Sequence, residues 1–96
     1  MKYADLHIHS SFSDGKLTPE QILEIACKKE IKYISITDHD SIDSQYITRE
    51  ANDKVTIIPG IELSSEIDDF EIHILGYFIN IDDDKLNETV NSLKKE

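Results

Sequence analysis

The residues of this chain that could do metal chemistry are histidines and carboxylates on strand-like segments. Residues 5–10 read Asp-Leu-His-Ile-His-Ser, with two histidines one residue apart. Successive side chains of a β-strand point to opposite faces, so we expect Tyr3, Asp5, His7 and His9 on one face and the intervening apolar residues on the other. Such a face is either solvated or holds something that needs imidazole and carboxylate groups.

Later strand-like segments supply matching residues. His39 follows the strand expected at 33–37, Glu62 lies in the run 61–64, and His73 lies in the strand expected at 71–79. In a parallel α/β fold, sites form at the carboxyl ends of strands. Imidazoles with carboxylates suit divalent zinc, manganese or iron. Two or more such ions, about 3.5–4 Å apart, would activate a water as nucleophile and clamp the oxygens of a phosphate.

Each of these residues also has an ordinary interpretation. His39 between two aspartates could belong to a helix-capping cluster, Glu62 could be solvated, and His73 could be a hydrogen-bonded core histidine. Asp14 before Gly15 is most simply a turn residue. All of these interpretations would have to hold together, so we favour one shared metal site.

The elements that must position these residues alternate between strands and helices. Thr18, Pro19 and Gln21 form a helix start, with a cap, a first-turn proline and a capping-box partner. We expect strands at 2–8, 33–37, 55–58 continuing past Pro59-Gly60 to 61–64, and 71–79, and helices at 18–30, 41–52 and from 82 onward. This order implies a mainly parallel sheet with helices on its outer face. In the last strand, the helices should cover Ile72, Ile74, Gly76 and Phe78.

Length and composition limit the class of protein. The 96 residues make one modest domain, and the formal charge of −10 argues against a broad nucleic-acid surface. A phosphorylated substrate stays compatible if bound cations supply positive charge. The single cysteine, Cys27, excludes an internal disulfide and a cysteine zinc cluster. Without a signal peptide or a long apolar run, we expect a cytoplasmic protein with no membrane contact.

Five segments together resemble the successive motifs of the polymerase and histidinol phosphatase (PHP) domain family. They are residues 5–10, 13–15, 37–40, 59–64 and 73–77, in order within residues 3–78. The resemblance implies an α/β fold of the distorted (β/α) barrel type, with a trinuclear metal centre that hydrolyses phosphate esters. At position 14 this chain has aspartate where some relatives have histidine. In this respect it resembles the branch of the family that acts on nucleotides and short oligonucleotides.

The resemblance also implies roles for particular residues. The implied metal ligands, with Glu62 bridging two ions, are His7, His9, Asp14, His39, Glu62 and His73. Metal-bound water, rather than a side chain, would act as the nucleophile. Carboxylates behind the ligands would orient the imidazoles, the candidates being Asp5 and Asp38 or Asp40.

The chain departs from the family pattern after His73. No histidine follows His73 and no cysteine follows Cys27, although the family's later motifs require such residues. We therefore expect an N-terminal piece of a longer protein: residues 1–80 would be part of the barrel, with about four strands and outer helices, and 81–96 a helix that begins an insertion. The exposed sheet edge of such a piece would favour self-association.

Three functions remain open from the sequence. The first is a phosphoesterase that acts on nucleotides or short oligonucleotides. The second is a metal-binding or structural fragment without catalysis, because the later ligands are missing. The third is the PHP module of a bacterial DNA polymerase, although no polymerase sequence is present.

Overall fold

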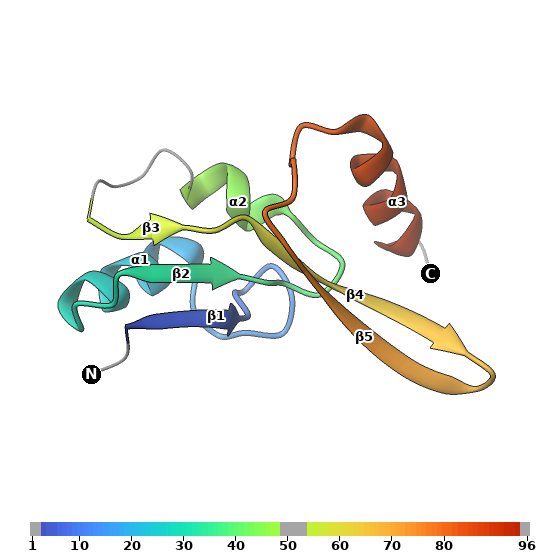
Figure 1. The fold of residues 1–96 in the computed structure, drawn as a ribbon, viewed down its shortest axis with the longest axis horizontal. Coiled ribbons are helices and arrows are strands. Elements are labelled where there is room, and N and C mark those ends of the chain that lie inside the picture. Colours follow the sequence, from blue (N-terminus) through green and yellow to red (C-terminus); the bar gives the residue numbers. More distant parts are fainter. Residues whose placement is uncertain (1–2, 49–53, 95–96) are drawn as a thin grey trace.

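A computed structural model describes residues 3–48 and 54–94 of the chain, drawn in Figure 1. The strands are β1 (Ala4–Ile8), β2 (Tyr33–Ile36), β3 (Thr56–Ile57), β4 (Gly60–Ile67) and β5 (Phe70–Tyr77), and the helices are α1 (Pro19–Lys28), α2 (Asp43–Thr48) and α3 (Asp84–Lys94). The last part of the helix expected at 41–52 lies outside the described residues. The fold is a mixed α/β arrangement, and the order of elements agrees with the expectation from the sequence, except that the strand expected at 55–64 is divided into β3 and β4.

Helix α1 begins where the sequence predicts. The Thr18 side chain accepts a hydrogen bond from the backbone N–H of Gln21, and the Gln21 side chain accepts one from the backbone N–H of Thr18. This reciprocal capping box satisfies two N–H groups that the first turn leaves unpaired. The helix then buries Ile22, Leu23 and Ala26 against the sheet, where they form one core cluster with residues of β2.

Strands β1, β2 and β3 form a parallel sheet in that order, as the alternation of elements predicts. The pairing of β1 with β2 contains an irregularity, because Asp5 pairs with Ile34 whereas Ile8 pairs with Ile36. Three residues of β1 therefore span two residues of β2, which is the geometry of a β-bulge. The bulge re-aims the side chains between Asp5 and the end of the strand.

Strand β4 continues the parallel pairing of β3, alongside the segment that follows β2. Thr56 pairs with Tyr33, and Glu62 bridges His39, so the offset between partners is 23 residues in both places (56 − 33 and 62 − 39). Pro59, which has no backbone N–H, lies in the gap between the two strands. A Cβ on Gly60 would lie 2.8 Å from the Thr37 methyl group, so only glycine allows this close crossing.

Strands β4 and β5 form an antiparallel hairpin that extends away from the three-stranded sheet (Figure 1). Only Asp68 and Asp69 separate them, and both residues have positive φ angles, 49° and 67°. A two-residue connection of this kind matches a type I′ turn and cannot join parallel strands. The expectation of a mainly parallel sheet therefore holds for β1, β2 and β3 but does not extend to β5.

Helix α3 covers only the base of this hairpin. Its Val90 packs with Ile42, Ile61 and Ile81 in a second core cluster. Further along the hairpin Ile74 is 53% exposed, and Phe78, just after β5, is 79% exposed. The expectation that helices cover these two side chains is wrong, because both are more than half exposed. Among the residues that the structure describes, no helix is long and apolar enough to cross a membrane.

Candidate metal centre

The ends of β1 and β2 and the hairpin bring four imidazole rings into one row. The ring centroids are 5.2 Å apart for His7 and His9, 4.3 Å for His9 and His39, and 5.1 Å for His39 and His73. The outer two histidines are separated by most of the described chain, so the row depends on the hairpin crossing back over the end of the parallel sheet.

Glu62 lies at the middle of this row and is only 4% exposed. Its Oε1 atom is 2.6 Å from Nε2 of His7 and 2.9 Å from Nε2 of His9. Its Oε2 atom is 2.6 Å from Nδ1 of His73 and 3.6 Å from Nδ1 of His39. Each carboxylate oxygen therefore faces its own pair of imidazoles, and β4 places the residue there through the backbone bridge to His39.

Asp14 completes the cluster from the loop after β1. Its Oδ1 atom is 2.6 Å from Nδ1 of His9, and its Oδ2 atom is 3.3 Å from Nε2 of His39. The loop folds back on the strand through backbone hydrogen bonds from Ser13 and Gly15 to the carbonyl of Ser10. Asp14 thus does more than turn the chain, because its carboxylate contacts two of the four rings.

The electrostatics of the cluster favour ionised carboxylates. Burial would raise the pKa of Glu62, but hydrogen bonds from His9, His7 and His73, with the charge of His39, lower it to about 2. Burial also opposes the shift at Asp14, where the hydrogen bond and charge of His9 hold the pKa below its ordinary value. The site therefore presents two carboxylates in their charged, ligand-competent form near neutral pH.

The arrangement of donor atoms fits divalent metal ions. Three groups of residues each place one ligand atom apiece within 4.8 Å of one another: His7–His9–Glu62, His9–Asp14–His39 and His39–Glu62–His73. The groups share His9, His39 and Glu62, so neighbouring ions would share ligands. Imidazole and carboxylate donors in this number suit borderline divalent ions rather than ions that require thiolates. All six residues singled out from the sequence belong to these groups.

Asp38 and Asp40 fix the backbone around the site. The buried Asp38 carboxylate accepts hydrogen bonds from the N–H and the hydroxyl of Ser10, at 2.5 and 2.6 Å, and from the hydroxyl of Ser13 at 2.9 Å. Asp40 accepts one from the N–H of Ser64 at 2.9 Å. These contacts hold the loop that carries Asp14 and the strand that carries Glu62, respectively.

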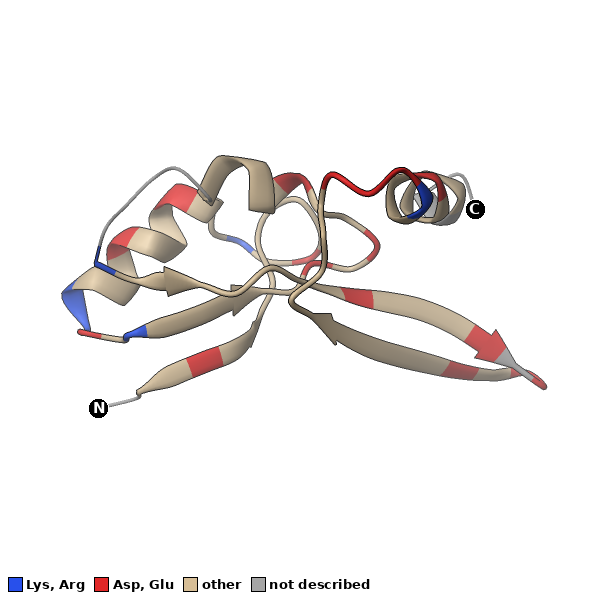
Figure 2. Cartoon of the chain, turned by 45° about the horizontal axis from the view of Figure 1, so that its top comes forward, with Lys and Arg blue, Asp and Glu red and all other residues tan. Residues whose placement is uncertain are grey.

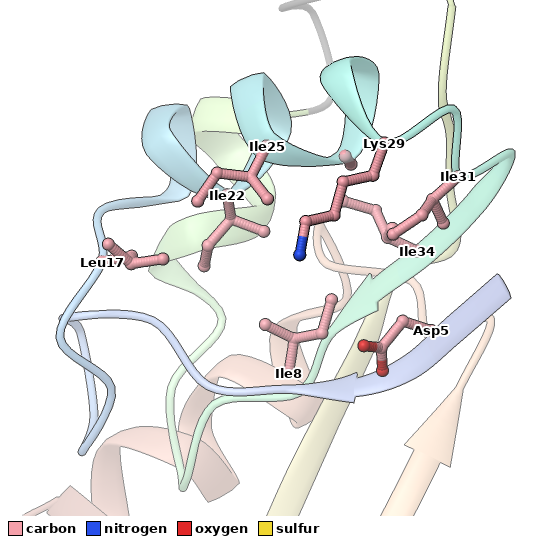
Figure 3. A pocket seen from close by; sticks show the side chains of 9 residues that line it. Asp5, Ile8, Leu17, Ile22, Ile25, Lys29, Ile31 and Ile34 are labelled. Carbon is pink, nitrogen blue, oxygen red and sulfur yellow. The ribbon is translucent and has the colours of Figure 1, made fainter. Parts of the chain in front are cut away.

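Asp5 does not share a face with His7 and His9, and that expectation is wrong. Its side chain accepts a hydrogen bond from the backbone N–H of His7 and lines a cavity of about 580 Å³ together with Ile8. Figure 3 shows both side chains directed into this space below α1. The bulge in β1 shifts the alternation of faces, and strict period-two counting cannot anticipate it.

Sequence reasoning missed one residue that contacts the cluster. Glu71 on β5 places Oε1 2.9 Å from Nε2 of His73, on the side of the ring away from Glu62. The signal was present in the sequence, because Glu71 lies two residues before His73 and so on the same face of its strand.

Comparisons with known proteins show the family of this chain. Residues 5–93 match the PHP domain family, and the chain belongs to that family. It is 39% identical over 81 residues to the 5'-3' exoribonuclease Rnm of Salmonella typhimurium, a match that covers 80% of this chain and 28% of that protein. It is 40% identical over 78 residues to the phosphoribosyl 1,2-cyclic phosphate 1,2-diphosphodiesterase of Eggerthella lenta, covering 75% and 29% of the two chains. The chain thus spans less than a third of the length of these curated relatives.

A solved structure shares the fold. An amidohydrolase from Chromobacterium violaceum, with bound sulfate and no metal, superposes with a TM-score of 0.90 at 27% identity. The match covers 97% of this chain and 34% of that one. Nearly every described element therefore has a counterpart in a larger protein of known structure.

Proposed function

We propose that this chain carries the metal centre of a phosphoesterase that hydrolyses phosphate esters of nucleotides or short oligonucleotides. One observation carries the proposal: the buried Glu62 directs its two oxygens at two separate pairs of imidazoles, with Asp14 beside them. Neighbouring ions would be bound by these donors, with Glu62 as the bridging ligand. The donor residues are His7, His9, Asp14, His39, Glu62 and His73. Manganese, zinc or iron fits these donors.

The charge of the chain restricts the substrate. The formal charge is −10, and the hairpin residues 60–77 contain no Lys or Arg. Acidic residues along the hairpin are visible in Figure 2. An extended nucleic acid would be repelled, whereas a short phosphate ester needs positive charge only at the ions. The Chromobacterium violaceum protein that shares this fold binds sulfate, an oxyanion shaped like phosphate.

Within this proposal the chain's own residues have defined tasks. Bound ions would lower the pKa of a water molecule at the site and would place positive charge beside the phosphate oxygens. The imidazoles and Glu62 would hold those ions, while Asp38 and Asp40 would keep the ligand-bearing segments in place. We further propose that residues 1–80 form part of a (β/α) barrel and that residues 81–96, which contain α3, begin a separate helical segment.

Metal analysis with an activity assay tests the proposal. We expect the purified chain, after incubation with manganese and dialysis, to retain at least one ion per molecule. The variant with both His7→Ala and His9→Ala should retain fewer, because two of the three donor groups lose members. Phosphate release should be measured with a nucleoside bisphosphate and a short oligoribonucleotide, with and without a chelator.

The outcomes separate the proposal from its rivals. Chelator-sensitive phosphate release that the double substitution removes supports the phosphoesterase. Stoichiometric metal binding without release supports a metal-binding fragment that lacks catalysis. Binding below one ion per chain, unchanged by the double substitution, would refute the metal centre.

We also propose that the chain self-associates through the exposed hairpin. The apolar side chains of Phe70, Ile74 and Phe78 are exposed there, and β5 pairs only with β4 among the described residues. Unpaired strand edges with apolar side chains favour pairing with a second copy. We expect the sedimentation coefficient to rise with concentration and Ile74→Lys to weaken this rise. A monomer at all concentrations would contradict it.

A further inference from the structure

The imidazole of His73 lies between two carboxylates. Its Nδ1 atom is 2.6 Å from Oε2 of Glu62, and its Nε2 atom is 2.9 Å from Oε1 of Glu71. Glu62 is buried and belongs to the candidate metal centre, whereas Glu71 is 75% exposed and is in none of the three donor groups. The two nitrogens of His73 therefore face different surroundings.

A neutral imidazole carries only one proton, so the two carboxylates compete for it. If His73 binds an ion through the nitrogen that faces Glu62, Nδ1 must be unprotonated and the proton must be on Nε2. Glu71 is placed to accept that proton in a hydrogen bond. Partners of this kind set the tautomer and the ring orientation of metal-binding histidines.

The stability of the hairpin gives no reason for a glutamate at position 71. Glu71 pairs directly with Glu66 across the two antiparallel strands, and like charges in such pairs are destabilising. Its contact with the partly exposed His73 contributes little stability in water. The hollow on this face is polar, lined by Ser64, Ser65, Glu66, Asp69 and Glu71, so apolar packing does not explain the residue either.

We propose that Glu71 is a positioning residue for the metal centre: it accepts the Nε2 proton of His73 and thereby presents Nδ1 of that ring to an ion beside Glu62. The inference rests on the proposed metal centre and extends it to a residue outside the donor groups. Glu71 acts through His73 and contacts neither the ion nor the substrate.

Two matched substitutions test this role. Glu71→Gln and Glu66→Gln each remove one charge from the same cross-strand pair, but only Glu71 contacts His73. Both should raise the resistance of the metal-free chain to urea by a similar small amount. Only Glu71→Gln should weaken zinc binding, by about tenfold, the lower end of the range for partners of metal-binding histidines. Zinc titration against a competing chelator measures the affinity.

Nitrogen NMR of the imidazole rings gives a second readout in the zinc-bound chain, because zinc is diamagnetic. In the unsubstituted chain and in Glu66→Gln, the His73 signal should report a proton on Nε2 and zinc on Nδ1. Equal zinc affinity for the unsubstituted chain and Glu71→Gln, or equal weakening by both substitutions, would overturn the role of Glu71. A chain that binds no zinc even when unsubstituted would instead refute the metal centre, and with it this inference.

Discussion

Glu62→Gln is expected to remove metal binding almost completely. Glu62 is a member of two of the three donor groups, and its two oxygens serve different pairs of imidazoles. A glutamine keeps the shape but has no negative charge and only one carbonyl oxygen. The loss of affinity should exceed the roughly 10–100-fold that partners behind the ligands cost when they are changed. Isothermal titration with zinc or manganese measures it.

The same substitution should change the acid sensitivity of the metal-free chain. The folded-state pKa of Glu62 is about 2, below its ordinary value of 4.5. The ionised carboxylate therefore stabilises the fold above pH 4.5, and this contribution is lost as the pH falls from about 4.5 toward about 2. Near neutral pH, Glu62→Gln should destabilise by about 1.5–3 kcal/mol, the range for hydrogen bonds to charged groups.

Urea unfolding above and below pH 4.5 provides the measurement, with Glu66→Gln as the control on the same strand. The difference in stability between Glu62→Gln and the unsubstituted chain should shrink at the lower pH. Wild-type zinc affinity in Glu62→Gln would show that the centre of the site has been assigned to the wrong residue.

Part of the cluster of candidate ligands was predictable because it depends on short-range regularities. Once strands are placed at residues 2–8 and 33–37, the carboxyl ends of these parallel strands bring His7 and His9 to the same edge of the sheet as His39. The capping box at Thr18 fixes the helix that must follow the first strand. Each of these signals spans only a few residues, so it can be read without knowledge of the tertiary structure.

The errors come from features in which one residue changes the geometry. A single extra residue in β1 moves Asp5 to the side of Ile8, and nothing in the composition of residues 5–8 reveals it. The direction of β5 could have been obtained from length alone. Parallel strands need a crossover of a dozen or more residues, and only Asp68 and Asp69 separate β4 from β5.

Glu71 shows a different limit of sequence reasoning. Its position on the same face as His73 was visible, but its importance follows from which ring nitrogen faces Glu62, at 2.6 Å through Nδ1. Which nitrogen faces Glu62 depends on the orientation of the His73 ring between Glu62 on β4 and Glu71 on β5. That orientation is a property of the assembled hairpin and not of either strand alone.

Gly15→Ala is expected to have the second largest effect, through the loop that carries Asp14. A Cβ at position 15 would lie 2.5 Å from the carbonyl carbon of His9 and 3.0 Å from that of Ser10. These are backbone atoms, so the clash cannot be relieved by a change of rotamer, and the loop must move. Overpacking of this kind costs about 1–3 kcal/mol. The displacement would also separate Asp14 from His9, which are 2.6 Å apart.

We therefore expect Gly15→Ala to lower both the urea midpoint and the metal stoichiometry. Gly76→Ala is the matched control, because its Cβ would meet Ile61 and Ile79 at ordinary contact distances of 3.6 and 3.7 Å. That change should be neutral or stabilising by up to about 1 kcal/mol, since alanine restricts the unfolded chain. A Gly15→Ala variant as stable and as metal-competent as Gly76→Ala would mean that the loop is not held against β1. The contacts of Asp14 with His9 and His39 would then not depend on the backbone fold of this loop.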